Sequence, residues 1–362
     1  MNSEKKDASY LIVYQDLRDK IISGAYPLHH FLPSKRTCAL QYNVSLITIE
    51  HAMRLLDEEG YITPRPRRGY EVIYQSGDLF NVPVTITEPV LERKREDYTK
   101  LFPYPQLAST MRHVLSEYQE EILERSEGSG CLILRQAIAA YLSRSRDMHV
   151  SPDQIIIAAG SESAYALIVQ MLSRKQIYGI EDPGYARIKR IYENEGVRVD
   201  RLKMGPNGIQ TSELQRTHAH ILHVTPVSSY PTGVSADAGK RQEYLKWAKE
   251  RQGILIEDDY ASEFAASSPI QKTLFAMEPE SSVIYLNSFT RTIAPSFRIS
   301  YMILPARRKE ELLGKIADLS CNVSTFDQLT VAQLLNNGGF ERHLNRVKRQ
   351  QRMQKHMKSF QK

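Results

Sequence analysis

The stretch "YLNSFTRTIAPSFRISYMILP", residues 285–305, decides the fold of the larger part of this 362-residue chain. It opens as an apolar strand and then brings Ser288, Arg291 and Arg298 together within one short segment. A hydroxyl and two guanidinium groups behind a strand are typical of an anion site, because all of them donate hydrogen bonds. The segment therefore predicts a binding site where a sheet strand ends.

Apolar runs and helical patterns alternate along the sequence before this stretch. The runs that read as buried strands are "QIIIAAG" (154–160), "HILHVTP" (220–226), "GILIEDDY" (253–260) and "SVIYLNSF" (282–289). Amphipathic segments such as "SESAYALIVQMLS" (161–173) lie between them. This alternation predicts an α/β domain with a mostly parallel sheet, in which ligands bind at the carboxyl ends of the strands.

Four polar clusters follow predicted strands: "GSES" (160–163), "EDPGY" (181–185), "EDDY" (257–260) and "NSFTR" (287–291). Any one of them alone also fits a solvated strand end or a plain helix cap. The ordered set favours a site for a phosphorylated aromatic cofactor, because phosphate binds at helix N-termini and at Arg side chains.

Each cluster has a chemical role in such a site. Ser161 would help to hold the phosphate at a helix N-terminus, and Ser288 and Arg298 would add phosphate contacts. Asp258 would pair with a protonated ring nitrogen, and Tyr185 would stack on the aromatic ring.

The first 75 residues predict a different kind of domain. Ser34 and Ser45 are placed to cap two short helices joined by a tight turn at Asn43. Two strand-like pieces follow, around the basic tip "RPRRG" (65–69). The pattern favours a winged helix that binds DNA; a small helical bundle with a solvated basic loop is the alternative.

These residues resemble the GntR family of bacterial regulators over "LRDKIISGAY", "LPSKRTCALQYNVSLITIEHAMRLLDEEGYI" and the wing. The resemblance implies contacts with double-stranded DNA. Leu46 departs from the family, which usually has Arg or Lys there, and we expect shifted specificity or weaker affinity. The implied DNA-binding residues are Ser34, Lys35, Arg36, Ser45, Leu46, Thr48, His51, Arg65, Arg67 and Arg68.

The remainder resembles fold-type I pyridoxal-phosphate aminotransferases, and the whole chain resembles the MocR regulators, which join a GntR-type domain to that fold. The motifs that carry the resemblance include "RQAIAAYLSRSR", "EDPGY", "IEDDYASEF" and "NSFTRTIAPSFRISY". It implies that Asp258 holds the pyridine nitrogen, Tyr260 contacts the ring hydroxyl and Tyr185 stacks on the ring. Phosphate contacts are implied for Ser161, Ser288 and Arg298.

The departures from this family concern catalysis. Arg291 occupies the position of the Schiff-base lysine, and a guanidinium cannot lose the proton that imine formation requires. The family usually has "SHQF" or "SHHF" before "PTG", whereas this chain has "VSSY" at 227–230. Ala261 replaces a usual Asp. We also expect the small C-terminal subdomain to be missing. No catalytic residue is therefore assigned, no amino transfer is expected, and pyridoxal phosphate would bind noncovalently if it binds.

We expect a GntR-type domain at 1–75, a linker at 76–100 and an aminotransferase-like domain at 101–362. The net charge of +6 is weak evidence for DNA binding, because residues 342–362 alone contain eight Lys and Arg and no acid. Three scattered cysteines predict no metal site and fit a cytoplasmic protein.

The favoured function is a DNA-binding transcriptional regulator that forms a homodimer and responds to a small amine or amino-acid effector. A pyridoxal-phosphate-dependent aminotransferase and a nonfunctional regulator fragment are the alternatives. The sequence lacks any long apolar run, so no membrane partner is expected.

Overall fold

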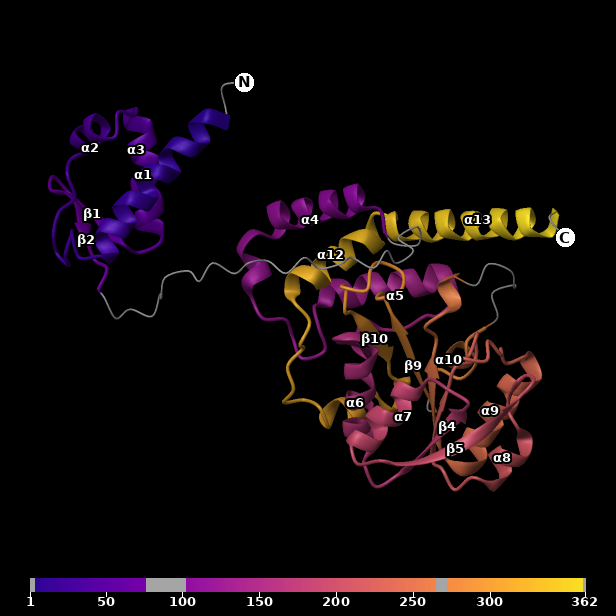
Figure 1. Cartoon of the computed structure of the whole chain (residues 1–362). Coiled ribbons are helices and arrows are strands. Elements are labelled where there is room, and N and C mark those ends of the chain that lie inside the picture. Colours follow the sequence, from indigo (N-terminus) through magenta and orange to yellow (C-terminus); the bar gives the residue numbers. More distant parts are fainter. Residues whose placement is uncertain (1–3, 76–101, 265–271, 281, 361–362) are drawn as a thin grey trace. The chain divides into compact units, whose positions relative to one another are not determined.

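The computed structural model describes residues 4–75, 102–264, 272–280 and 282–360 (Figure 1). The chain divides into two compact units, residues 1–93 and 94–362, and each is described by itself. The predicted linker at 76–100 lies outside the described residues. Among the described residues, no helix is long and apolar enough to cross a membrane.

The first unit is a winged helix-turn-helix, as predicted. Its elements are α1 (Glu4–Ile22), α2 (Lys35–Gln41), α3 (Leu46–Glu58), β1 (Ile62–Arg65) and β2 (Gly69–Val72). The two strands pair antiparallel and form the wing. Ser34 and Ser45 are the N-caps of α2 and α3, and each side chain accepts a backbone N–H bond of 3.2 Å.

The core of this unit lies between α1 and α3. Leu17 and Ile21 from α1 are buried with Ile49 and Met53 from α3. Nearer the start of α1, Val13 is also buried in this core, whereas Leu11 is 41% exposed.

The second unit is the predicted α/β domain, and Figure 1 labels most of its elements. Its helices are α4 (Tyr104–Tyr118), α5 (Leu132–Arg146), α6 (Gly160–Leu172), α7 (Ala186–Asn194), α8 (Thr211–Arg216), α9 (Ala238–Arg251), α10 (Leu274–Met277), α11 (Lys309–Gly314), α12 (Thr325–Asn336) and α13 (Gly339–Phe360). Its strands are β3 (Ile155–Ala158), β4 (Ile177–Asp182), β5 (Arg198–Gly205), β6 (Gly208–Ile209), β7 (Ile221–Val224), β8 (Ile254–Asp258), β9 (Val283–Ser288) and β10 (Ser300–Ile303).

These eight strands form one sheet in the order β3-β10-β9-β8-β7-β4-β5-β6. Neighbouring strands from β9 to β5 are parallel, which confirms the predicted sheet type. Strand β10 runs antiparallel to both β3 and β9, and β6 is antiparallel to β5. The carboxyl ends of β4, β7, β8 and β9 therefore meet at one edge.

Both faces of the sheet are covered by helices. Along β9, Val283 and Tyr285 pack into one apolar cluster, whereas Ile284 and Leu286 pack into the other. This alternation is the two-residue period of a strand that is buried on both faces. On α5, Leu132 is 43% exposed, because the helix begins there and its packed face starts at Leu134.

Candidate functional site

A cavity of about 480 Å³ lies where the strands of the second unit end. All six residues predicted to bind a cofactor line it, and so does Arg291. Further lining residues, which the sequence did not indicate, include two tyrosines, two threonines and a third arginine. The full lining is Ser161, Glu162, Tyr165, Tyr185, Arg187, Ile188, Thr225, Tyr230, Asp258, Tyr260, Ser288, Thr290, Arg291 and Arg298.

The N-terminus of α6 forms one part of the cavity wall. Gly160 begins the helix with a φ of +81°, and the helix has no side-chain cap, so its first N–H groups have no acceptor within the helix. A Cβ at this position would lie 2.9 Å from Nη2 of Arg298. Glycine is therefore required for the backbone conformation and for the approach of the arginine.

Ser288 lies at the end of β9 beside this helix terminus. Its Oγ donates to the carbonyl of Ile299 at 3.3 Å and accepts from the N–H of Thr290 at 3.2 Å. These bonds tie the strand end to the loop that presents Arg291 and Arg298. Because the donor of this hydroxyl and one of its two acceptor sites are already used, its main effect is to hold the loop.

The charges in this part of the cavity favour an anion. Arg187 is paired with Glu162, Nη1 to Oε1 at 2.6 Å. Arg291 and Arg298 have no carboxylate within ion-pair distance among the residues that the structure describes. An uncompensated guanidinium, Arg298, beside the N-terminus of α6, with a second one, Arg291, on the wall of the same cavity, suits a phosphate.

Asp258 provides the negative group of the cavity. It is the last residue of β8 and is 4% exposed, and its Oδ2 accepts from the Tyr165 hydroxyl at 2.5 Å. Burial raises the pKa of Tyr165 well above its usual value, so the phenol stays protonated and donates. The imidazole of His223 lies behind, with Nε2 at 3.5 Å from the same oxygen.

His223 adds an unsatisfied polar atom to this region. Its Nδ1 is hydrogen-bonded to the Tyr192 hydroxyl at 2.7 Å. Its Nε2 is buried and has no hydrogen-bond partner among the described residues. A carboxylate backed by an imidazole and a neutral phenol is suited to bind a cationic ring nitrogen, because burial strengthens the charge pair.

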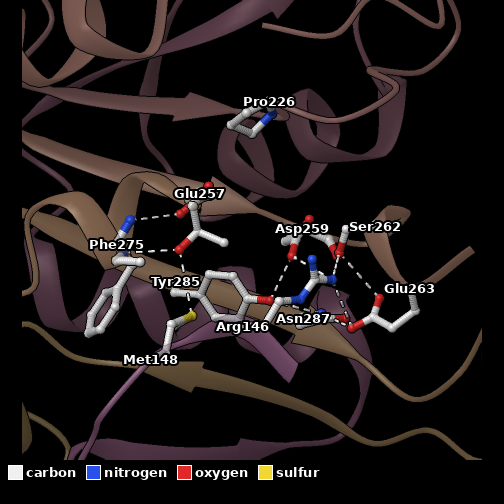
Figure 2. A network of polar contacts seen from close by, with 12 residues as sticks. Arg146, Met148, Pro226, Glu257, Asp259, Ser262, Glu263, Phe275, Tyr285 and Asn287 are labelled. Atoms are coloured by element: carbon white, nitrogen blue, oxygen red, sulfur yellow. Dashed lines mark hydrogen bonds and ion pairs between the residues drawn. The ribbon is translucent and has the colours of Figure 1, made fainter. Parts of the chain in front are cut away.

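The position of the β8 end is fixed by a buried ionic network on the other side of the strand (Figure 2). The guanidinium of Arg146 lies 3.4 Å from Asp259 and 3.6 Å from Glu263. The Tyr285 hydroxyl donates to Asp259 at 2.7 Å, and the Asn287 amide donates to Glu263 at 2.6 Å. Burial raises the pKa of both carboxyls, and Arg146 opposes this shift. The network holds Asp259 and so positions its neighbour in the cavity.

Tyr260 and Arg291 lie against each other at the cavity wall. The Cζ atom of Arg291 is 5.2 Å from the centre of the Tyr260 ring, a cation–π contact. The Tyr260 hydroxyl donates to the carbonyl of Ser228 at 2.8 Å. No lysine is among the described residues that line this cavity. At position 291 the cavity wall therefore presents a charged guanidinium and no amine.

Glu181 holds the loop that brings Tyr230 to the cavity. Its carboxyl group accepts from the N–H of Thr225 at 2.9 Å and from the hydroxyl of Ser229 at 2.5 Å. Burial raises the pKa of Glu181 to about 7. Tyr230 meets the ring of Tyr185 edge to face, with the ring centres 6.0 Å apart.

The raised pKa of Glu181 makes stability depend on pH. The folded state binds this proton more tightly than the unfolded chain, whose glutamate has a pKa near 4.5. The free energy of unfolding therefore falls as pH rises from about 4.5 through about 7. Burial also raises the pKa of Glu257 to about 7, so Glu257 changes stability in the same direction.

We expect Glu181→Gln to reduce the loss of Tm between pH 5.5 and pH 8 by a few degrees. The glutamine oxygen still accepts from Thr225, and the amide can donate to Ser229, so the loop is kept. Thermal melts across this pH range measure the effect. Glu193→Gln, an exposed glutamate paired with Lys189 on α7, is the control. An unchanged pH profile in Glu181→Gln would contradict the assignment.

The DNA-binding residues predicted from the sequence lie on the surface of the first unit. Two of the basic side chains are already paired: Lys35 with Glu50 at 3.0 Å and Arg65 with Glu71 at 2.5 Å. Arg36, Arg67 and Arg68 have no carboxylate partner among the described residues and are exposed. Arg67 has a φ of +63°, which turns the tip of the wing.

Two family models match the chain. The model described as bacterial regulatory proteins, gntR family, matches residues 9–72, and the model of aminotransferase class I and II matches residues 104–362. Fold and matches together define a regulator with a winged-helix DNA-binding domain and an aminotransferase-like domain. The chain belongs to the MocR-type family of helix-turn-helix transcriptional regulators.

Relatives of this kind match nearly the whole chain. The uncharacterised helix-turn-helix regulator YdeL of Bacillus subtilis is 30% identical, over 94% of this chain and 76% of YdeL. The pyridoxine biosynthesis regulator PdxR of Corynebacterium glutamicum is 28% identical, over 88% of this chain and 71% of PdxR. The probable rhizopine catabolism regulator MocR of Rhizobium meliloti is 23% identical, over 93% and 73%.

Solved aminotransferases share the fold of the second unit. LysN, the α-aminoadipate aminotransferase of Thermus thermophilus, was solved with N-(5'-phosphopyridoxyl)-L-leucine; it matches with a TM-score of 0.61 and 26% identity, over 69% of this chain and 65% of that chain. An archaeal alanine:glyoxylate aminotransferase matches with a TM-score of 0.63 and 20% identity, over 68% and 63%. The chain thus spans less than two thirds of these enzymes' length.

Proposed function

We propose that this regulator binds pyridoxal phosphate noncovalently in the cavity of its aminotransferase-like domain and uses it to sense a small amine or amino acid. The observation that supports this most is the separation of charge in the cavity. The cavity holds a buried carboxylate, Asp258, and two uncompensated guanidinium groups, of which Arg298 lies by the N-terminus of α6 and Arg291 lines the wall. Pyridoxal phosphate has a basic ring nitrogen and a phosphate, which match these two groups.

The residues present fit this cofactor. Ser161, Arg298 and the first N–H groups of α6 would bind the phosphate, and Ser288 would hold their loop. Asp258 would accept from the ring nitrogen, and the exposed ring of Tyr185 would stack on the pyridine. The Tyr260 hydroxyl donates its proton to Ser228, so its oxygen is free to accept from the ring hydroxyl.

When bound, the cofactor supplies an aldehyde that reacts with amines. This chain offers Arg291 at the anchor position, and an arginine neither forms an imine nor moves a proton at neutral pH. The protein therefore binds and orients the group, and the aldehyde stays available to an amine from solution. We infer that the chain has no aminotransferase activity.

Equilibrium dialysis of the full chain tests this function. We expect saturable binding of pyridoxal phosphate and clearly weaker binding of pyridoxal, which lacks the phosphate. Equal affinity for the two would contradict the assignment of the phosphate site, and no saturable binding of either would overturn the proposal.

DNA binding by the first unit is tested at the wing. We propose that Arg67 and Arg68 contact phosphates, as they are exposed and free of carboxylate partners among the described residues. The double variant Arg67→Ala/Arg68→Ala is expected to weaken binding to all duplexes alike and to lower the slope of log affinity against log salt by about 2. Titrations at several salt concentrations measure both quantities.

The matched control removes two positive charges elsewhere. Lys246 and Arg307 lie exposed on the second unit, so Lys246→Ala/Arg307→Ala changes net charge equally. We expect its salt slope to equal that of the unchanged chain. If the wing variant behaves like this control, the wing does not contact DNA.

We further propose that the protein binds DNA as a homodimer, which suits paired half-sites.

A further inference from the structure

The solvent face of α3 begins with two branched apolar side chains. Leu46 and Ile47 are the first two residues of this helix, and they are 46% and 66% exposed. The opposite face of the helix is fully buried in the core, through Ile49 and Met53. The core therefore does not explain these two residues, and Ile47 in particular points away from it by helical spacing.

The cations on this side of α3 are already neutralised. Lys35 pairs with Glu50 at 3.0 Å, and Arg54 pairs with Glu58 at 3.6 Å. In the described part of the unit, the exposed guanidinium groups without a carboxylate partner belong to Arg36, Arg67 and Arg68. These lie on α2 and at the wing tip and suit phosphates on the flanks of a site. At the start of α3, the exposed side chains at positions 46 and 47 are apolar.

The second helix of a helix-turn-helix enters the major groove with its N-terminal residues next to the base edges. The groove contains one apolar feature, the C5-methyl group of thymine, whereas guanine is read by Arg or Lys with two hydrogen bonds. We propose that Leu46 and Ile47 read thymine methyl groups in the operator. This inference rests on the proposed DNA binding and specifies the base that is recognised.

The proposal follows from chemical complementarity. Contact between an exposed isoleucine and another apolar group lowers the free energy, because water is removed from both surfaces. Against guanine or cytosine at the same position the side chain would instead cover a polar edge without a hydrogen bond, which is unfavourable. The pair therefore selects by contact with the methyl group and by exclusion of the polar edges.

The experiment begins with a selection of bound duplexes from a random pool by the full chain. The selected duplex is then prepared with each thymine replaced in turn by uracil, which removes only the C5-methyl group. We expect about three- to tenfold weaker binding at one or two positions per half-site, the effect of one lost methyl contact. Uracil at the other positions should leave the affinity unchanged.

Variants identify the side chains that read the methyl groups. In Leu46→Ala/Ile47→Ala, thymine and uracil should bind equally at those positions. Leu40→Ala is the matched control, because Leu40 is also an exposed branched side chain, 83% exposed at the end of α2, and should keep the discrimination. All three residues are exposed, so thermal melts should show an unchanged fold.

The outcomes separate the two proposals. If no duplex is enriched, DNA binding itself fails, and this inference fails with it. If duplexes are enriched and uracil replaces thymine everywhere without loss, DNA binding stands and thymine reading is overturned. Discrimination that persists in Leu46→Ala/Ile47→Ala would overturn the assignment to these two residues.

Discussion

Replacing Arg291 with lysine is expected to turn noncovalent cofactor binding into covalent binding. A lysine amine beside a bound aldehyde can lose its proton and form an imine, and the guanidinium of Arg291 cannot. The arginine lies on the cavity wall against Tyr260, so a lysine there would reach the same space. After incubation with pyridoxal phosphate and reduction with borohydride, we expect one label per chain in Arg291→Lys and none in the unchanged chain.

Arg187→Lys is the matched control for this gain of reactivity. Arg187 lines the same cavity but lies on α7 and is paired with Glu162. We expect no label in this variant. Labelling of Arg187→Lys without labelling of Arg291→Lys would show that the anchor position has been assigned to the wrong residue.

Asp258→Asn is expected to weaken the binding of pyridoxal phosphate about 10- to 100-fold. The substitution keeps the shape of the side chain and removes its charge, and a hydrogen bond to a charged group contributes about 1.5–3 kcal/mol. The neutral amide no longer stabilises a protonated ring nitrogen. Equilibrium dialysis gives the affinity, and a thermal melt shows whether the fold is retained.

Asp182→Asn serves as the control for charge removal at a strand end. Asp182 closes β4, is paired with Arg201 at 2.6 Å and does not line the cavity. Its substitution should leave the affinity unchanged. If Asp258→Asn binds the cofactor as tightly as this control, the carboxylate does not contact the ring nitrogen.

The sequence predicted the strands that are buried on both faces, because their apolar runs are continuous. Strand β5 was missed, since "RVDRLKMG" exposes charged side chains along most of its length. Strand β10 was also missed, because it enters the sheet between β3 and β9, which are far apart in sequence. Such a pairing depends on tertiary packing and leaves no local pattern.

Only part of the cavity lining was predicted, because the remaining residues also depend on tertiary packing. The six residues assigned to a cofactor were recognisable by their places near strand ends, and all six line the cavity. Tyr165 and His223 lie inside a helix and a strand and look like core residues. Tyr165 follows Ser161 by four positions on α6, and this spacing was the available signal, since such residues share one helix face. The support that His223 gives to Asp258 depends on strand order.

We propose above all that the cavity holds pyridoxal phosphate without a covalent bond. The most direct measurement is the intact mass of the unchanged chain after saturation with pyridoxal phosphate and borohydride reduction, beside the bound amount before reduction. We expect saturable binding and an unchanged mass. An increase by one reduced cofactor at a single lysine would contradict it, because an amine would then serve as the anchor in place of Arg291.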